Sequence, residues 1–199
     1  MQISAIKSDN NLSDAPMLGD HLAMDLLNTQ AVDNGNTVEY WHSDNDVLQW
    51  LARYDITPAA GGGAFKPEEL LTQAKALRLL AHRLISEFRS GTVQDISGLN
   101  EYLHAYHSVL HLQYNKETNT LALNRVASGG TIASLLGPVA EAIAQLLVEG
   151  DAALVKQCEH PDCILWFYDR TKAHKRRWCS MALCGNRYKA AQFRKRSSG

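Results

Sequence analysis

The side chains with the clearest chemistry are four cysteines, which are all the cysteines of the 199-residue sequence. They form two pairs of equal spacing near its end, Cys158 with Cys163 and Cys179 with Cys184, separated by fifteen residues. Two short cysteine loops joined by a spacer of this length are typical of a tetrahedral four-thiolate Zn²⁺ site. Four protein ligands leave no position for water, so we expect a single structural zinc ion rather than a catalytic one.

A segment of about forty residues buries too little apolar surface to offset its chain entropy, which makes a metal or disulfides necessary. The alternatives to zinc are two local disulfides, one within each pair, or four buried thiols. Disulfides need an oxidising compartment, whereas residues 1–16 are polar and lack the apolar stretch of a secretory signal. This favours zinc and a cytoplasmic location. His160 and His174 are close enough to be substitute ligands, although His160 fits a turn better.

The segment around the cysteines resembles the CGNR zinc finger. The resemblance rests on Trp178 to Met181, on Cys184-Gly185-Asn186-Arg187 with Lys189, and on upstream Phe167 to Thr171 and the Arg176-Arg177 pair. Thr171 stands where the family commonly has serine. The resemblance implies a treble-clef-like or ribbon-like finger that binds DNA at the C-terminal end of a bacterial transcription regulator.

Charge is distributed unevenly along the sequence. From Cys158 onward there are ten Lys and Arg against three Asp and Glu, whereas the residues before it carry ten against eighteen. Four thiolates and one Zn²⁺ leave the finger at a formal charge of +5, which favours a polyanionic partner. We expect DNA contacts from the spacer loop and from a helix beginning near Gly185, namely Arg170, Lys172, Lys175, Arg176, Arg177, Arg187, Lys189 and Arg194.

Two other interpretations of the basic segment stay open. It could dock on the acidic N-terminal part of the chain, or it could bind another protein, which would make the chain a protein-interaction adaptor with a zinc-stapled tail. Catalysis is not expected, because no Ser-His-Asp order, His-Glu-x-x-His motif or phosphate loop can be assigned and the cysteines are committed to metal. A homodimer is a candidate assembly, since many regulators read paired half-sites.

The residues before the finger predict a mainly helical domain at 17–150, preceded by a flexible arm at 1–16 and followed by the finger at 151–199. Apolar spacing predicts helices at 18–29, 46–54, 67–90, 96–110 and 132–149, with Pro138 inside the last. Two alternating runs at 111–115 and 120–126 predict one small β-hairpin, and the glycines at 61–63 predict a flexible loop. No run of apolar residues is long enough for a membrane span.

The segment Leu18 to Thr29 is similar to the start of the ABATE domain, a helical domain that precedes a CGNR finger in stress-response, ligand-sensing regulators. Asp25, Asn28 and Thr29 form a polar cluster on this segment. They could bind a small-molecule effector or tie helices together, and the second use is commoner for buried polar groups. A second row, His104, His107 and His111, has helical ligand spacing but no carboxylate beside it, so a solvated face is favoured.

Overall fold

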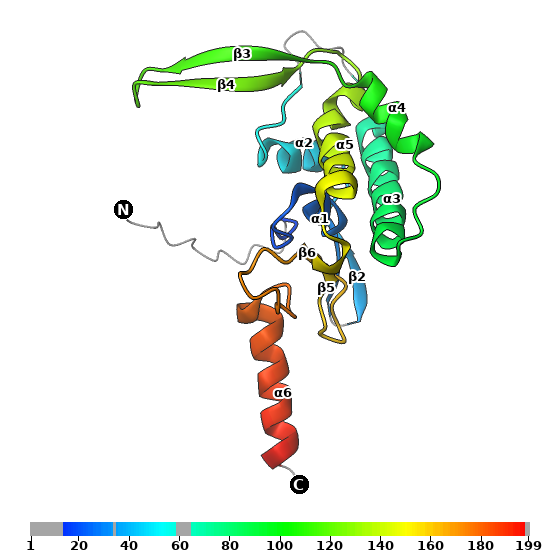
Figure 1. Ribbon diagram of the computed structural model, residues 1–199, viewed down its shortest axis with the longest axis vertical. Coiled ribbons are helices and arrows are strands. Elements are labelled where there is room, and N and C mark those ends of the chain that lie inside the picture. The colour runs from blue at the N-terminus through cyan, green and yellow to red at the C-terminus, as the bar shows by residue number, and fades with distance from the viewer. Residues whose placement is uncertain (1–13, 34, 59–64, 198–199) are drawn as a thin grey trace.

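The computed structural model describes residues 14–33, 35–58 and 65–197 of the chain. Within these ranges five helices form the body, and among them α3 and α5 run side by side (Figure 1). The helices are α1 (Leu22–Leu27), α2 (Asp44–Ala52), α3 (Glu69–Ser90), α4 (Ser97–Ala105) and α5 (Ile132–Glu149). The prediction of a mainly helical chain is confirmed.

In the described part of the chain, three antiparallel pairs of strands accompany the helices. They are β1 (Gln30–Asp33) with β2 (Asn36–Glu39), β3 (Ser108–Asn115) with β4 (Thr120–Ala127), and β5 (Val155–Gln157) with β6 (Trp166–Tyr168). The second pair is the predicted hairpin, with longer strands than expected. The other two pairs were not predicted, because strands of three or four residues are too short to display a clear alternation.

Local sequence sets where the helices begin and end. Ser43 and Asp46 form a reciprocal capping box at the start of α2. The carboxylate of Asp44 then accepts hydrogen bonds from the backbone N–H groups of Glu68 and Leu71, so α2 also caps the start of α3. At its other end α3 stops at Gly91, whose φ of +70° suits glycine.

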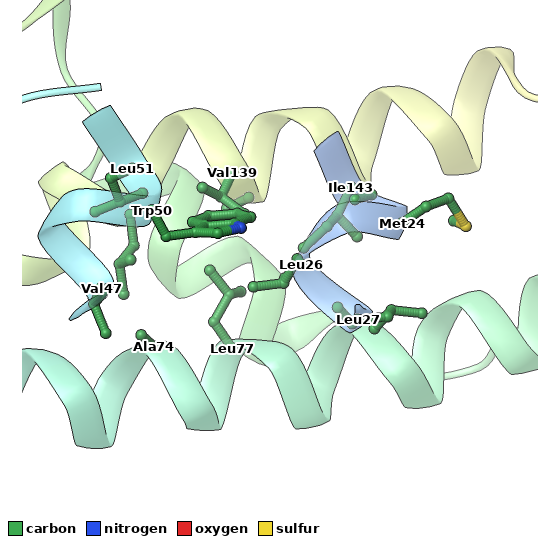
Figure 2. Packing of buried hydrophobic residues seen from close by; sticks show 14 of the residues in the cluster. Met24, Leu26, Leu27, Val47, Trp50, Leu51, Ala74, Leu77, Val139 and Ile143 are labelled. Carbon is green, nitrogen blue, oxygen red and sulfur yellow. The ribbon is translucent and has the colours of Figure 1, made fainter. Parts of the chain in front are cut away.

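The main core lies between α3 and α5, with α1 and α2 crossing the space between them (Figure 2). Leu26, Trp50, Leu77 and Val139 meet there and are each at most 3 % exposed. By length and composition α5 is the one helix in the described ranges that could cross a membrane. Its packing on α1, α3 and α4 accounts for that apolar content, because a central core helix is apolar on most sides.

The last part of the chain begins with a 3₁₀ turn at Ala152–Leu154 and the β5–β6 pair. A π-helical turn, Met181–Gly185, then leads into α6 (Asn186–Ser197), which projects away from the body (Figure 1). The predicted helix near Gly185 is therefore present.

Several predicted boundaries were wrong. The first helix covers only Leu22–Leu27, since His21 caps its start and Asn28 its end. The helix expected to reach residue 110 stops at Ala105, and β3 begins at Ser108. His104 therefore lies in a helix and His111 in a strand, so the three histidines do not form a helical row. The predicted loop at 61–63 and residues 1–13 of the predicted arm lie outside the described residues.

Candidate metal centre and basic surface

The four cysteines come together at the base of the finger. Their Sγ atoms all lie within 4.8 Å of one another, with Cys163 at 3.8 Å and Cys184 at 3.5 Å from Cys179. A zinc ion about 2.3 Å from each sulfur in a tetrahedron places the sulfurs roughly 3.8 Å apart. Disulfide sulfurs would be separated by about 2.0 Å, and all four thiols are free. The arrangement fits a single structural zinc site.

Two backbone turns hold the sulfurs in place. In the first, the Cys163 N–H donates to the carbonyl of His160 at 3.0 Å, and the Nδ1 atom of His160 accepts from the Asp162 N–H at 3.2 Å. The imidazole of His160 therefore stabilises this turn, as expected for a turn residue. In the second, the hydroxyl of Ser180 accepts from the Leu183 N–H at 3.3 Å, and the Gly185 N–H donates to the Ser180 carbonyl at 3.1 Å.

The thiols need a cation in order to ionise together. The Cys163 and Cys179 side chains, followed by the backbone N–H groups of Cys179 and His160, lower the pKa of Cys158. Burial raises the pKa of the Cys184 thiol to about 12. Several thiolates at this separation repel one another, so one sulfur ionises at the expense of the rest. A bound dication supplies the missing positive charge and deprotonates its thiol ligands.

Apolar side chains pack around the cysteines. Phe167 and Trp178 are buried against the cysteines, and Tyr188 of α6 stacks on Trp178 with ring centroids 4.8 Å apart. Ala31 of β1 is buried in the same cluster. Phe167 and Trp178 therefore form an apolar floor beside the cysteines.

Trp166, which lies next to Phe167 in β6, belongs to the main core. Its ring lies against two residues of α3, with His82 edge-on at 5.7 Å and the guanidinium of Arg89 at 5.0 Å. The finger thus contributes a core residue to the body, and β1 of the body contributes to the finger. Residues of the two predicted domains therefore pack against each other.

A buried carboxylate organises the spacer loop between the cysteine pairs. Asp169 is 0 % exposed and accepts from the Nζ atom of Lys156 at 2.6 Å, the Thr171 hydroxyl at 2.6 Å and the Arg176 N–H at 2.9 Å. Burial acts to raise the pKa of Asp169, but these hydrogen bonds outweigh it and hold the pKa well below its usual range. Lys156 was not predicted, because a lone lysine in a short strand has no distinguishing pattern.

Most of the predicted DNA-binding side chains are exposed to solvent, whereas Arg176 is partly buried. Arg170, Lys172, Lys175, Arg187, Lys189 and Arg194 are exposed. Arg177 is also exposed, but its Nε atom pairs with Glu159 at 2.6 Å. On α6, which has no buried residue, five Lys and Arg occur without an acidic residue.

Arg176 is used inside the protein. Its guanidinium pairs with Asp20, donates to the carbonyls of Leu18 and Trp178 at 2.9 Å each, and lies 4.2 Å from the centroid of the Phe167 ring. These contacts join the finger to the start of α1 and leave little of the guanidinium for an external partner.

The three residues of the predicted effector cluster also form hydrogen bonds within the protein. Asp25 accepts from the Gly19 N–H at 2.8 Å, and Asn28 makes two hydrogen bonds with the backbone of Trp166. The hydroxyl of Thr29 donates to Leu26 and accepts from Arg78. All three side chains are buried and partnered, which favours the tying role over effector binding.

Two family models match parts of the chain. Residues 155–197 match the model of the CGNR zinc finger, and residues 20–150 match the ABATE model, described as "Putative stress-induced transcription regulator". The ABATE description is regulatory, and the other names a zinc finger. No curated protein matches the chain significantly.

Proposed function

The chain belongs to the ABATE family, whose model covers 20–150 of its 199 residues, and we propose that this regulatory zinc-binding protein is a DNA-binding transcription regulator. The zinc site folds the finger, and the finger presents α6 to the duplex. The observation that most supports DNA binding is the composition of α6. This 12-residue helix has five basic residues, no acidic residue and no buried residue.

The geometry of α6 suits a nucleic acid more than a folded protein surface. Arg187 and Arg194 are seven residues apart and share one face, and Ala190 and Ala191 lie between them. Small side chains at the centre of a helix face allow its backbone to approach the duplex closely. A helix of this size enters a major groove, where arginines hold phosphates or read guanine edges.

The spacer loop would add phosphate contacts. Arg170, Lys172 and Lys175 are exposed there, and the ion pair of half-buried Lys156 with buried Asp169 holds the loop that carries them. Each phosphate that is neutralised releases condensed counterions, so affinity should fall steeply with salt. Arg176 is left out of this proposal because it ties the finger to the body.

Response to a small effector stays a prediction from the family resemblance. Asp25, Asn28 and Thr29 are occupied by contacts within the fold, so we do not propose them as its binding residues. Any effector would have to act from another part of the body.

The test is the salt dependence of duplex binding, measured by fluorescence anisotropy with a labelled random-sequence duplex of about 30 base pairs. Each lost phosphate contact lowers the slope of log K against log salt by about 0.9. The double variant Arg187→Ala with Arg194→Ala should therefore lower the slope by roughly 2 and weaken binding at every salt concentration.

The matched control is Lys66→Ala with Lys116→Ala, which removes the same charge from exposed positions outside the finger. It should leave the slope nearly unchanged. An equal decrease in the salt slope of both variants would mean that the effect comes from net charge and not from contacts of α6. Tighter binding of a polyglutamate chain than of the duplex at matched charge would favour the adaptor interpretation instead.

A further inference from the structure

The β3–β4 hairpin projects from the body instead of packing on it (Figure 1). Its register places Leu112 opposite Leu123 and Tyr114 opposite Leu121. Since side chains alternate between the two faces of a strand, these four residues and Leu110 share one face. They are between 55 % and 66 % exposed, which is unusual for five large apolar side chains in succession.

The opposite face of the hairpin is mostly polar. His111, Gln113 and Asn115 of β3 lie on it, together with Thr120 and Ala122 of β4, and all five are exposed. The hairpin is therefore an amphipathic ribbon. Its sequence has the pattern of a strand pair with one buried face, yet nothing in the described part of the chain covers that face.

The base of the ribbon is firmly held. The Ser128 N–H donates to the His107 carbonyl at 2.7 Å, and Tyr106 packs directly on Gly137 of α5. A Cβ atom at position 137 would lie 2.3 Å from the Tyr106 ring, so glycine is needed for this approach. The body thus holds the base of the ribbon in the orientation in which the ribbon projects outward.

Leaving the apolar face of this ribbon in contact with water is unfavourable in free energy. A lone two-stranded hairpin is at best marginally stable in water. Its five apolar side chains expose on the order of 500 Å², close to the largest apolar patch of a typical monomer, and such patches commonly mark binding surfaces.

We propose that this face is covered by the same face of a second copy of the chain, which forms a symmetric dimer. This face also includes position 125, an arginine that the register places opposite Leu110 at the base of the ribbon. The outer part of the face, Leu112, Tyr114, Leu121 and Leu123, has no charged member, so two copies can stack there without desolvating a charge. A twofold interface must be self-complementary, and a flat aliphatic ribbon meets that requirement. Complete covering of both faces would bury about 1,000 Å², which is the lower limit for a biological interface.

The position of the ribbon suits this assembly. It leaves the body at the end opposite to α6, so ribbon stacking would keep both basic helices exposed (Figure 1). The dimer would hold two zinc fingers as one particle. Dimerisation follows from the uncovered face alone, and it stands whether or not the chain binds DNA.

The experiment measures mass in solution without DNA, by sedimentation equilibrium over about 1–100 µM protein. The wild type should have twice the 22.1 kDa chain mass. Replacing the opposed pair Leu112 and Leu123 by Asp should raise the dimer dissociation constant at least 100-fold and give a monomer. The neighbouring opposed pair, Gln113→Asp with Ala122→Asp, puts the same charges on the polar face and should leave the dimer intact.

Circular dichroism and zinc content separate loss of the dimer from loss of the fold. If the Asp pair does not fold, Leu112→Ala with Leu123→Ala should still weaken the dimer about 10-fold or more. A wild type that is monomeric throughout the range, or a dimer that is insensitive to the Leu112 and Leu123 changes, overturns the proposal. A monomer that binds lipid vesicles through this face would identify a membrane as the occupant instead.

Discussion

The side-chain amide of Asn28 forms two hydrogen bonds with the backbone of Trp166, which lies 138 residues later in the chain. Its Nδ2 atom donates to the Trp166 carbonyl at 2.9 Å, and its Oδ1 atom accepts from the Trp166 N–H at 2.8 Å. The amide therefore replaces the neighbouring strand that β6 lacks on this side. Asn28 ends α1, so the pairing fixes the finger to the helical body.

Asn28→Ala should destabilise the fold by about 2–4 kcal/mol, because it leaves both buried backbone groups of Trp166 without a partner. The free energy of unfolding from urea titration measures this. Asn45→Ala removes an exposed amide from α2 and should cost less than about 0.5 kcal/mol. A similar loss in the two variants would mean that the Asn28 contacts contribute little.

Removal of zinc should weaken the body as well as the finger. From sequence, the body is expected to remain folded on its own when residues beyond 158 unfold. The structure gives a reason to revise that prediction, because Trp166 fills the main core while Ala31 packs beside the cysteines. Chelation or Cys179→Ser should therefore increase amide hydrogen exchange in β1 and β2.

The hydrogen-exchange measurement needs a reference segment in the body that is remote from the finger. Helix α4, packed on α5, provides this reference. Protection should be lost first in β5 and β6, then in β1 and β2, and last in α4. Unchanged exchange in β1 and β2 after complete zinc removal would favour independent domains.

Arg176→Ala should affect stability more than nucleic-acid binding. The variant loses the contact with Asp20, three carbonyl acceptors and the packing on Phe167. We expect a loss of about 2–3 kcal/mol in unfolding free energy. The salt slope of duplex binding should change by less than for Arg187→Ala. A reduced slope with unchanged stability would return Arg176 to the DNA-contacting set.

His21 makes the stability of α1 sensitive to acid. Its Nδ1 atom accepts from the Ala23 N–H at 3.1 Å and so caps the helix with a neutral ring. Burial, followed by the nearby charge of Arg170, lowers the pKa of His21 below 6.5. The unfolded chain therefore binds the proton more readily, and this contribution to stability is present above pH 6.5 and lost as the pH falls through the folded pKa.

His21→Asn keeps a capping acceptor that does not titrate in this range. The difference in urea midpoint between pH 7.5 and pH 5.5 should be smaller in the variant than in the wild type. Protonation of the zinc ligands affects both proteins alike, so the comparison isolates His21. Identical pH dependence in the two proteins would show that His21 does not contribute.

The zinc site could be predicted from sequence because its determinants are local. Each cysteine pair closes its own short turn, and thiolate chemistry selects the metal whatever surrounds it. Helices α3 and α5 were also predictable, since long apolar periods appear in the chain itself. The hairpin at β3–β4 was predictable from its alternation, but its exposure was not.

The roles of Arg176 and Asn28 could not be predicted, because they depend on contacts between residues more than one hundred positions apart. Arg176 looked like a DNA-contacting residue within a basic run, and only the approach of Asp20 revealed its structural use. Asn28 and Trp166 offered no sign of each other in sequence. A hydrogen bond depends on where the chain brings two groups, and that position is set by packing of the whole core. The sequence by itself determined the metal and the basic helix, and the tertiary structure decided which charges and amides are left to face solvent.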